Sequence, residues 1–167
     1  MYYGEGVKTI AVIGWKNSGK TTLVSNLVNY FSSNININVG VIKHAHHSFD
    51  IDKPNTDSYK IRKSGAYKTI IISEKRLAYI EERKDSTLDL NQLIDLNKGC
   101  DLLIFEGFKK IKELKKIEVR LKKNDHENLY HSIDNVKLLV TDDDKNHPIK
   151  SFKHNQIELI AEEILNG

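Results

Sequence analysis

Residues 14–21 read Gly14-Trp15-Lys16-Asn17-Ser18-Gly19-Lys20-Thr21, and they match the pattern G-x-x-x-x-G-K-[ST] of phosphate-binding loops. The preceding residues 7–13 are apolar and β-branched, which predicts a short strand buried on both faces. After the loop, Leu23, Leu27 and Phe31 recur at helical spacing, which predicts a helix over residues 21–31. A strand, this loop and a helix in that order are the context that the motif requires, so the sequence predicts binding of a nucleoside triphosphate.

The residue types in this loop explain how it would hold phosphate. Gly14 and Gly19 let the backbone fold tightly around an anion, because no Cβ stands in the way. The exposed N–H groups of the loop and the helix start then point at the β-phosphate, with help from the helix dipole. We expect Lys20 to reach the β and γ oxygens, which makes it a candidate catalytic residue, and the Thr21 hydroxyl to bind Mg²⁺.

Length and composition describe a globular chain, predicted as a single P-loop domain over residues 1–167, with 39% hydrophobic and 29% charged residues. The net charge of +3 is too small to argue for nucleic acid by itself. Cys100 is the only cysteine, so no internal disulfide can form, which suits a reducing compartment. With no signal-peptide pattern and no apolar run of membrane-spanning length, we expect a cytoplasmic protein with no membrane partner.

Residues 38–43 predict a second strand, expected to lie beside the first in a parallel sheet. This strand delivers the loop of residues 44–52 to the edge of the sheet where ligands bind. If residues 49–52 are extended, Asp50 and Asp52 project to one side. Their carboxylates can then face the triphosphate and its metal.

Three histidines, His44, His46 and His47, stand at the start of the same loop. Their spacing matches no structural zinc pattern, and no cysteine lies nearby to complete one. Loop histidines more often form hydrogen bonds or face phosphates than bind metals. We therefore favour a role for His44 beside the nucleotide, and keep metal binding by the three histidines as an alternative.

The middle of the chain predicts a short helix and two strands. Asp57 is expected to cap a helix over residues 58–64, which Gly65 closes in a left-handed conformation. Residues 67–72 predict one strand, and residues 76–83 predict another whose charged flanks are typical of a sheet edge. A further helix is expected to begin at residue 86 or 87 and to end at Gly99.

The apolar run of residues 101–107 carries an acid near each end, Asp101 and Glu106. Five residues of strand separate the two acids by roughly 16 Å, so both cannot bind one metal. Ligands bind at the carboxyl end of parallel strands, which selects Glu106. We expect Glu106 to hold a Mg²⁺-bound water or to orient the attacking water, and Asp101 to be a polar strand end.

Residues 108–131 are the most charged segment and are rich in lysine. Residues 117–121 alternate as a half-buried strand does, which favours an edge strand fringed by lysines. A basic surface for an anionic ligand or a partner protein is the alternative. Aromatic residues do not interleave with these lysines, so a nucleic-acid partner is not expected.

The last part of the chain predicts a strand over residues 136–140 and a final helix capped by Asn155. Between them, residues 141–145 carry three aspartates. A carboxylate such as that of Asp142 can accept from the N1 and N2 hydrogens of guanine, a donor pair that adenine lacks. An acidic surface turn is an equally good interpretation, since no N-K-x-D motif is present.

Four stretches of this sequence together resemble the MobB family, whose members assist molybdopterin-guanine dinucleotide biosynthesis. They are residues 14–23 (GWKNSGKTTL), 41–58 (VIKHAHHSFDIDKPNTDS), 62–66 (RKSGA) and 101–109 (DLLIFEGFK). The resemblance implies a three-layer α/β P-loop NTPase fold whose mostly parallel sheet has antiparallel edge strands. It also implies GTP and Mg²⁺ as cofactors, weak GTP hydrolysis, and a homodimer built partly through extended strands. Molybdopterin, or the guanylyltransferase that makes its dinucleotide form, is then the expected partner of a GTP-binding adaptor.

The resemblance also assigns roles by position. By position, the residues expected to bind the nucleotide are Gly14, Trp15, Lys16, Asn17, Ser18, Gly19, Lys20, Thr21 and Thr22, and the chemistry of the loops described above adds His44 and Asp142. The residues expected around the metal are Thr21, Asp50, Asp52 and Glu106, and the candidate catalytic residues are Lys20 and Glu106. One departure is Asn55, which stands where glycine is expected after the proline; asparagine tolerates positive φ, so we expect the turn to survive.

Two other functions remain open from the sequence. A small-molecule kinase can use the same loop, but kinases commonly bring arginines to the transferring phosphoryl group. The arginines of this chain are Arg62, Arg76, Arg83 and Arg120. This scarcity favours slow hydrolysis over efficient transfer. The second alternative is a GTPase that delivers a metal through His44, His46 and His47.

Overall fold

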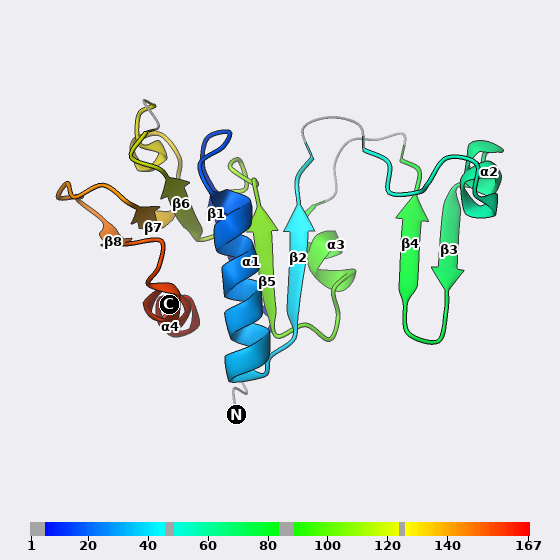
Figure 1. The fold of residues 1–167 in the computed structure, drawn as a ribbon, viewed down its shortest axis with the longest axis horizontal. Coiled ribbons are helices and arrows are strands. Elements are labelled where there is room, and N and C mark those ends of the chain that lie inside the picture. Colours follow the sequence, from blue (N-terminus) through cyan, green and yellow to red (C-terminus); the bar gives the residue numbers. More distant parts are fainter. Residues whose placement is uncertain (1–5, 46–48, 84–88, 124–125) are drawn as a thin grey trace. The chain divides into compact units, whose positions relative to one another are not determined.

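The computed structural model describes residues 6–45, 49–83, 89–123 and 126–167 (Figure 1). The chain divides into two compact units. The first unit comprises Met1–His44 and Leu90–Gly167, and the second comprises Ala45–Asp89.

In its described residues, the first unit is built on a six-stranded sheet with the order β2-β5-β1-β6-β7-β8, in which every neighbouring pair is parallel. The strands are β1 (Lys8–Ile13), β2 (Val39–Lys43), β5 (Leu102–Glu106), β6 (Lys116–Arg120), β7 (Val136–Thr141) and β8 (Lys150–Phe152). Figure 1 shows β2 and β5 ending at the same edge of the sheet, where α1 begins. The predicted α/β fold with a mostly parallel sheet is confirmed.

Helices α1 (Lys20–Tyr30) and α4 (Ile157–Asn166) pack on one face of this sheet. Alternate residues of the strands supply the apolar surface beneath them. The core on this face contains Ile10, Val12, Leu23, Val24, Leu27, Phe31, Leu102, Ile104, Ile117, Val119, Leu138, Val140, Ile160, Ala161 and Ile164. At its end α1 continues into one π-helical turn, Phe31–Ile35. The periodicity that predicted the first helix therefore marks the side that faces the core.

The opposite face of the sheet is also buried. Leu93 of α3 (Leu90–Asp95) is buried, as are Leu114 and Leu129, the last of which begins the 3₁₀ helix Leu129–His131. Gly40 of β2 is closely covered: an added Cβ would lie 2.6 Å from the Leu103 side chain of β5 and 3.0 Å from Asn97 Oδ1, in the segment after α3. The sheet is therefore covered on both sides, as its strands of continuous apolar residues require.

The order of the strands corrects one prediction. The strand at residues 38–43 was expected beside the first strand, but β5 lies between β2 and β1. Burial explains this arrangement. Every residue of β5 is buried, which only an interior strand achieves, whereas Val41 of β2 is 44% exposed and tolerates the edge.

A second correction concerns β6, which was expected at the sheet edge and lies between β1 and β7. Its charged residues are buried because each has partners. The Glu118 carboxylate accepts the backbone N–H groups of Leu129 (2.8 Å) and Tyr130 (3.0 Å). The Lys116 ammonium donates to two backbone carbonyls, and burial lowers the pKa of this lysine. The alternating polar residues thus have the sequence pattern of a solvent-facing strand, although Lys116 and Glu118 are buried and hydrogen-bonded to backbone groups.

In its described residues, the second unit contains α2 (Asp57–Lys63) and a two-stranded antiparallel sheet of β3 (Lys68–Ile72) and β4 (Leu77–Glu81). The predicted antiparallel strands therefore exist, but they pair with each other in a sheet of their own. The turn before α2 survives as expected, since Asn55 takes a φ of 71°.

Helix ends account for the remaining differences. Thr56 caps α2 by accepting the Tyr59 N–H, and Asp57, the predicted cap, is the first helical residue. Gln156, not Asn155, stands at the N-cap of α4. Gly65 and Gly99 adopt positive φ as expected, although α3 ends at Asp95, before Gly99. The predicted start of that helix at residue 86 or 87 lies outside the described residues.

The described part of the chain contains no helix with both the length and the apolar character that crossing a bilayer requires.

We expect Glu118→Ala to lower the free energy of unfolding by about 2 to 4 kcal/mol, because it leaves two buried N–H groups without an acceptor. Denaturant unfolding followed by circular dichroism measures this change. Glu113→Ala, at an exposed position just before the same strand, is the matched control and should stay within about 0.5 kcal/mol of the original chain. Equal stability of both variants would contradict the role given to the Glu118 carboxylate.

Candidate functional site

The loop of residues 14–19 turns sharply from the end of β1 into α1. Gly14 is packed so closely that an added Cβ would lie 2.3 Å from Ser18 Oγ and 2.4 Å from the Val119 carbonyl oxygen. Gly19 and Asn17 adopt positive φ, at 93° and 58°. Glycine is therefore required at position 14 by close approach and is favoured at position 19 by backbone conformation.

Lys20 is the first residue of α1, and its side chain folds back over this loop. Its ammonium donates to the carbonyl oxygens of Trp15 (2.6 Å) and Gly14 (3.3 Å). Burial is the main cause of a lowered Lys20 pKa; Glu106 opposes this shift, whereas Lys109 and Lys43 add to it. The charge of this lysine is thus partly desolvated and positioned beside the loop, where an anion would stabilise it.

Glu106 lies where the sequence placed it, at the carboxyl end of β5 beside the loop. The Thr21 hydroxyl donates to Glu106 Oε1 at 3.1 Å, and the Lys43 ammonium lies 2.9 Å from the same oxygen. Asp101, at the other end of the strand, accepts the Asn38 N–H as the polar strand end that was expected. The structure therefore brings together the hydroxyl and the carboxylate predicted to surround a metal.

Thr21 and Glu106 suit a Mg²⁺ ion next to bound phosphates. This ion usually takes one or two carboxylates and completes its octahedron with phosphate oxygens and waters. Within the described residues, no group of three or more His, Cys, Asp or Glu side chains is placed to hold a metal without such help. The residues present fit a metal that arrives with the nucleotide.

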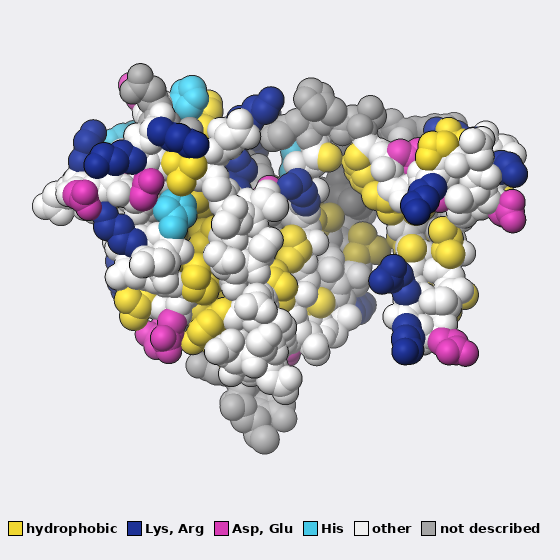
Figure 2. Space-filling view, in the orientation of Figure 1, with side chains coloured by type: hydrophobic (Ala, Val, Ile, Leu, Met, Phe, Trp, Pro, Cys, Tyr) yellow, Lys and Arg dark blue, Asp and Glu magenta, His cyan; other side chains and the backbone are white. Residues whose placement is uncertain are grey.

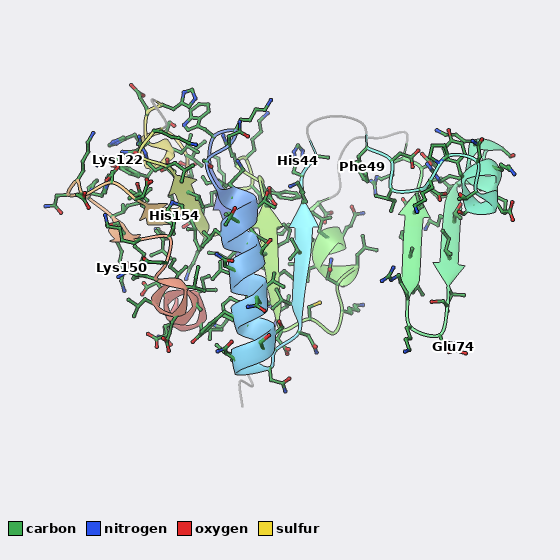
Figure 3. The ribbon with its side chains drawn as sticks, in the orientation of Figure 1. His44, Phe49, Glu74, Lys122, Lys150 and His154 are labelled. Carbon is green, nitrogen blue, oxygen red and sulfur yellow. The ribbon has the colours of Figure 1, made fainter. Side chains whose placement is uncertain are left out.

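His44 follows β2 directly and lies just beyond the end of that strand (Figure 3). Its backbone N–H donates to the Glu106 carbonyl oxygen (3.0 Å), and its ring packs edge-on against Phe108, with ring centroids 5.5 Å apart. This contact places His44 at the same edge of the sheet as the phosphate loop. His46 and His47, the other two histidines of the metal-binding alternative, lie outside the described residues.

Trp15, inside the loop, makes contacts that the sequence did not reveal. Its indole N–H donates to the Glu127 carbonyl oxygen (3.1 Å), and its ring lies against that of His126, with centroids 4.6 Å apart. The Lys109 ammonium lies 4.6 Å from the centroid of the same indole ring, at cation–π distance. Two separate segments of the first unit, one at Lys109 and one at His126 and Glu127, thus meet at the phosphate loop. The only sign of these contacts in the sequence was the tryptophan itself, and its position in the loop did not predict which residues it contacts.

Asp142 lies in the loop after β7 and accepts the backbone N–H of Lys122, in the loop after β6. Beside them is a hollow of ≈ 440 Å³ lined by Leu121, Lys122, Lys123 and Asp142. The neighbouring Asp143 is buried and bound to His147 (2.8 Å), so its carboxylate is engaged inside the loop. Of these two aspartates, Asp142 is the one that lines an open space.

Asp50 and Asp52 belong to the second unit, where both interact with Arg62. Arg62 donates to Asp50 (2.5 Å) and to Glu82 (2.6 Å), and the hydrogen bond from Arg62 is the main reason that the pKa of Asp50 is lowered. Asp52 accepts the hydroxyls of Thr56 (3.1 Å) and Ser58 (3.0 Å). Within the second unit these carboxylates fix the chain around α2; their part in metal binding stays a prediction.

Comparison with known proteins identifies relatives of this chain. A family model described as molybdopterin guanine dinucleotide synthesis protein B (MobB) matches residues 9–142. The molybdopterin-guanine dinucleotide biosynthesis adapter protein of Escherichia coli (strain K12) is 42% identical over 107 residues, which cover 62% of this chain and 60% of that protein. The adapter protein of the same description from Haemophilus influenzae is 33% identical over 111 residues, or 65% of this chain and 61% of that protein. The chain thus matches these relatives over about three fifths of their length.

Solved structures agree with the sequence comparison. The crystal structure of molybdopterin-guanine biosynthesis protein B superimposes with a TM-score of 0.73 and 28% identity, covering 95% of this chain and 97% of the other. The structure of a MobB homolog from Bacillus stearothermophilus gives a TM-score of 0.70 over 95% and 99% of the two chains. At 19% identity, that second likeness concerns the fold alone.

We expect the emission of Trp15 to change when GTP and Mg²⁺ are added, because ordering of the loop around phosphates alters the contacts of the indole. Trp15 is the only tryptophan in the chain, so the signal is unambiguous. A fluorescence titration measures the change, with Lys20→Ala as the variant that should show none over the same range. An identical response in that variant would show that the signal does not report on the loop.

Proposed function

We propose that this chain, which belongs to the MobB family, is a GTP-binding adapter in the biosynthesis of molybdopterin-guanine dinucleotide. The observation that carries the proposal is the phosphate loop together with the hydrogen bond from Thr21, in the helix that follows the loop, to Glu106. The E. coli and H. influenzae relatives bear the name of adapter proteins of this biosynthesis, which supports the same role here.

In the proposed nucleotide site, the loop wraps the phosphates with its backbone N–H groups. The residues that we assign to it are Gly14, Trp15, Lys16, Asn17, Ser18, Gly19, Lys20, Thr21 and Thr22. Lys20 exchanges its bonds to the loop carbonyls for bonds to the β and γ oxygens. This exchange replaces two neutral acceptors by charged ones, which strengthens each hydrogen bond.

The proposed metal is Mg²⁺, held by Thr21 and Glu106 together with phosphate oxygens. When bound, it supplies positive charge that neutralises the phosphates and orients a water molecule. Thr21 would present its hydroxyl oxygen to the metal, and Glu106 would hold a metal-bound water or orient the attacking water. We propose that His44, which lies at the same edge of the sheet, contacts the nucleotide; metal binding by Asp50 and Asp52 stays a prediction from the sequence.

Guanine is the proposed base, with Asp142 as the residue that selects it. The carboxylate of Asp142 lines the hollow between the loops after β6 and β7. It can accept both the N1 and the N2 hydrogens of guanine, whereas adenine presents no such donor pair. The neighbouring Asp143 is committed to His147, so Asp142 is the better candidate of the two.

Weak GTP hydrolysis is proposed because three of the four arginines of the chain have other partners, and the fourth, Arg76, is an exposed residue of the second unit. Arg62 is held by Asp50 and Glu82, Arg120 donates to Asn128, and Arg83 is paired with Glu81 at 3.6 Å. An arginine that neutralises charge on the transferring phosphoryl group accelerates such reactions greatly. Without one, the bound nucleotide persists, which suits an adapter better than a catalyst.

The hairpin of β3 and β4 supports a homodimer. It exposes the large apolar side chains Ile70, Ile71, Ile72, Leu77 and Tyr79, with Ile72 at 75% exposure, and Figure 2 shows apolar atoms at the surface of this unit. A hairpin of this size is marginal alone, and exposed apolar strands pair readily with other strands. We propose that a second copy covers it, and that the dimer acts in the cytoplasm with molybdopterin or its guanylyltransferase.

Competition between GTP and ATP for the purified protein, run with and without molybdopterin, tests the proposal. GTP should displace a labelled GTP analogue at least about tenfold better than ATP, because adenine offers no pair of N–H donors to the Asp142 carboxylate. Lys20→Ala should abolish triphosphate binding, since it removes the cation that faces the β and γ oxygens. Equal competition by ATP would refute the choice of guanine; unchanged affinity in the Lys20 variant would refute the site itself.

We expect Glu106→Gln to leave nucleotide affinity within roughly tenfold of the original while slowing hydrolysis, because a partner of the metal-bound water acts mainly on the reaction. Phosphate release under single-turnover conditions measures the rate, and equilibrium binding measures the affinity. Asp101→Asn, at the amino end of the same strand, is the matched control and should leave the hydrolysis rate unchanged. Hydrolysis at the original rate in the Glu106 variant would end its proposed role.

A further inference from the structure

One oxygen atom of Glu106 serves two partners from different elements. Oε1 accepts the Thr21 hydroxyl at 3.1 Å and the Lys43 ammonium at 2.9 Å. This is the carboxylate proposed above to face Mg²⁺. Lys43 has no part in the phosphate-loop motif or in the proposed metal ligands. Its ammonium nevertheless lies where the charge of the metal would act.

The register of the sheet builds this ion pair. Lys43 and Glu106 are directly opposite each other on the parallel strands β2 and β5, as the last residue of each strand. The next residue, His44, donates its N–H to the Glu106 carbonyl oxygen and extends the pairing beyond the strands. Figure 1 shows these two strand ends side by side. The backbone register therefore keeps Lys43 within reach of the carboxylate.

The two partners differ in their access to solvent. The Glu106 side chain is 9% exposed, whereas that of Lys43 is 58% exposed. The carboxylate is therefore held in place, and the lysine can swing away from it without a change in the backbone. An ion pair with one exposed partner contributes little free energy, so another cation can replace the lysine at the carboxylate.

Positive charge is already concentrated at this point. Besides Lys43, the ammonium groups of Lys20 and Lys109 act on the same region, and repulsion from Lys109 and Lys43 adds to the burial that lowers the Lys20 pKa. A Mg²⁺ ion placed beside Glu106 would bring two more positive charges to it. The lysine nearest the carboxylate must then give way to the metal, because both need the same negative charge.

We propose that Lys43 is a positioning residue that holds Glu106 in an ion pair until Mg²⁺ enters, and that it sets the Mg²⁺ concentration needed for tight nucleotide binding. The proposal rests on the assignment of Glu106 to the metal surroundings. Once displaced, the Lys43 ammonium turns to the anionic oxygens of the bound triphosphate. Lys43 thus neutralises the Glu106 carboxylate in the free protein and the phosphates in the protein with bound nucleotide and Mg²⁺.

A Mg²⁺ titration of nucleotide affinity tests this exchange. The probe is a fluorescent, non-hydrolysable GTP analogue, measured first with a chelator and then over a series of Mg²⁺ concentrations. The test variant is Lys43→Met, which keeps the apolar stem of the side chain and removes its charge. Lys43→Arg keeps the charge, and Lys98→Ala removes an exposed lysine that is paired with Asp95 away from Glu106.

Removal of the competing ammonium should lower the half-saturating Mg²⁺ concentration of Lys43→Met by roughly three- to tenfold, the range for a charged hydrogen bond discounted for exposure. Its affinity measured with chelator should be unchanged or weaker. Lys43→Arg and Lys98→Ala should match the original chain.

The possible failures are distinguishable. If the original chain responds to Mg²⁺ and Lys43→Met needs the same or a higher concentration, the competition by Lys43 is refuted and the metal assignment stands. If Mg²⁺ has no effect on nucleotide affinity in the original chain, the metal assignment of Glu106 is refuted, and the role of Lys43 with it. A shift in Lys98→Ala equal to that in Lys43→Met would also overturn the proposal, since it would reflect net charge alone.

Discussion

The register of three parallel strands places Lys43, Glu106 and Val12 in one row at the carboxyl edge of the sheet. The contacts among Thr21, Lys43 and Glu106 depend on this row. The loop that begins after Ile13, the next residue of β1, turns into α1, and the first turn of that helix places Thr21 beside Glu106. A slip of one residue in β5 would turn Glu106 to the other face and leave Thr21 and Lys43 without their shared acceptor.

Buried charges extend this constraint to the rest of the first unit. Glu118 lies inside the sheet and fixes the segment at Leu129 and Tyr130 through two backbone N–H groups. The residues just before that segment hold Trp15, whose indole N–H reaches the Glu127 carbonyl. The buried Glu118 carboxylate thereby fixes the segment that contacts Trp15 of the phosphate loop. Such a role explains why a glutamate is tolerated where a central strand would otherwise carry an apolar residue.

Local sequence patterns predicted the helices and strands of this fold well, but they did not predict which strands are neighbours in the sheet. The motif at residues 14–21 predicted the loop, and the apolar run before Glu106 predicted a buried strand with its acid at the ligand edge. The place of β2 beyond β5 was not predictable, because strand order follows from which strand must be buried on both faces. The interior position of β6 was missed for a related reason, since a buried, hydrogen-bonded Glu118 has the same sequence pattern as a solvated one.

The chain's own residue order was enough to establish the phosphate loop, the acid across from it and the helix that carries Lys20 and Thr21, because each depends on local spacing and on the sterics of glycine. The folded molecule alone decided which distant groups meet there. Lys43 reaches Glu106, and Lys109 and the segment at His126 reach Trp15, only because strands far apart in the sequence end at one edge of the sheet. Contacts of that kind arise from the order and register of the strands. Both depend on the burial of the whole sheet, so the sequence of a single segment does not predict them.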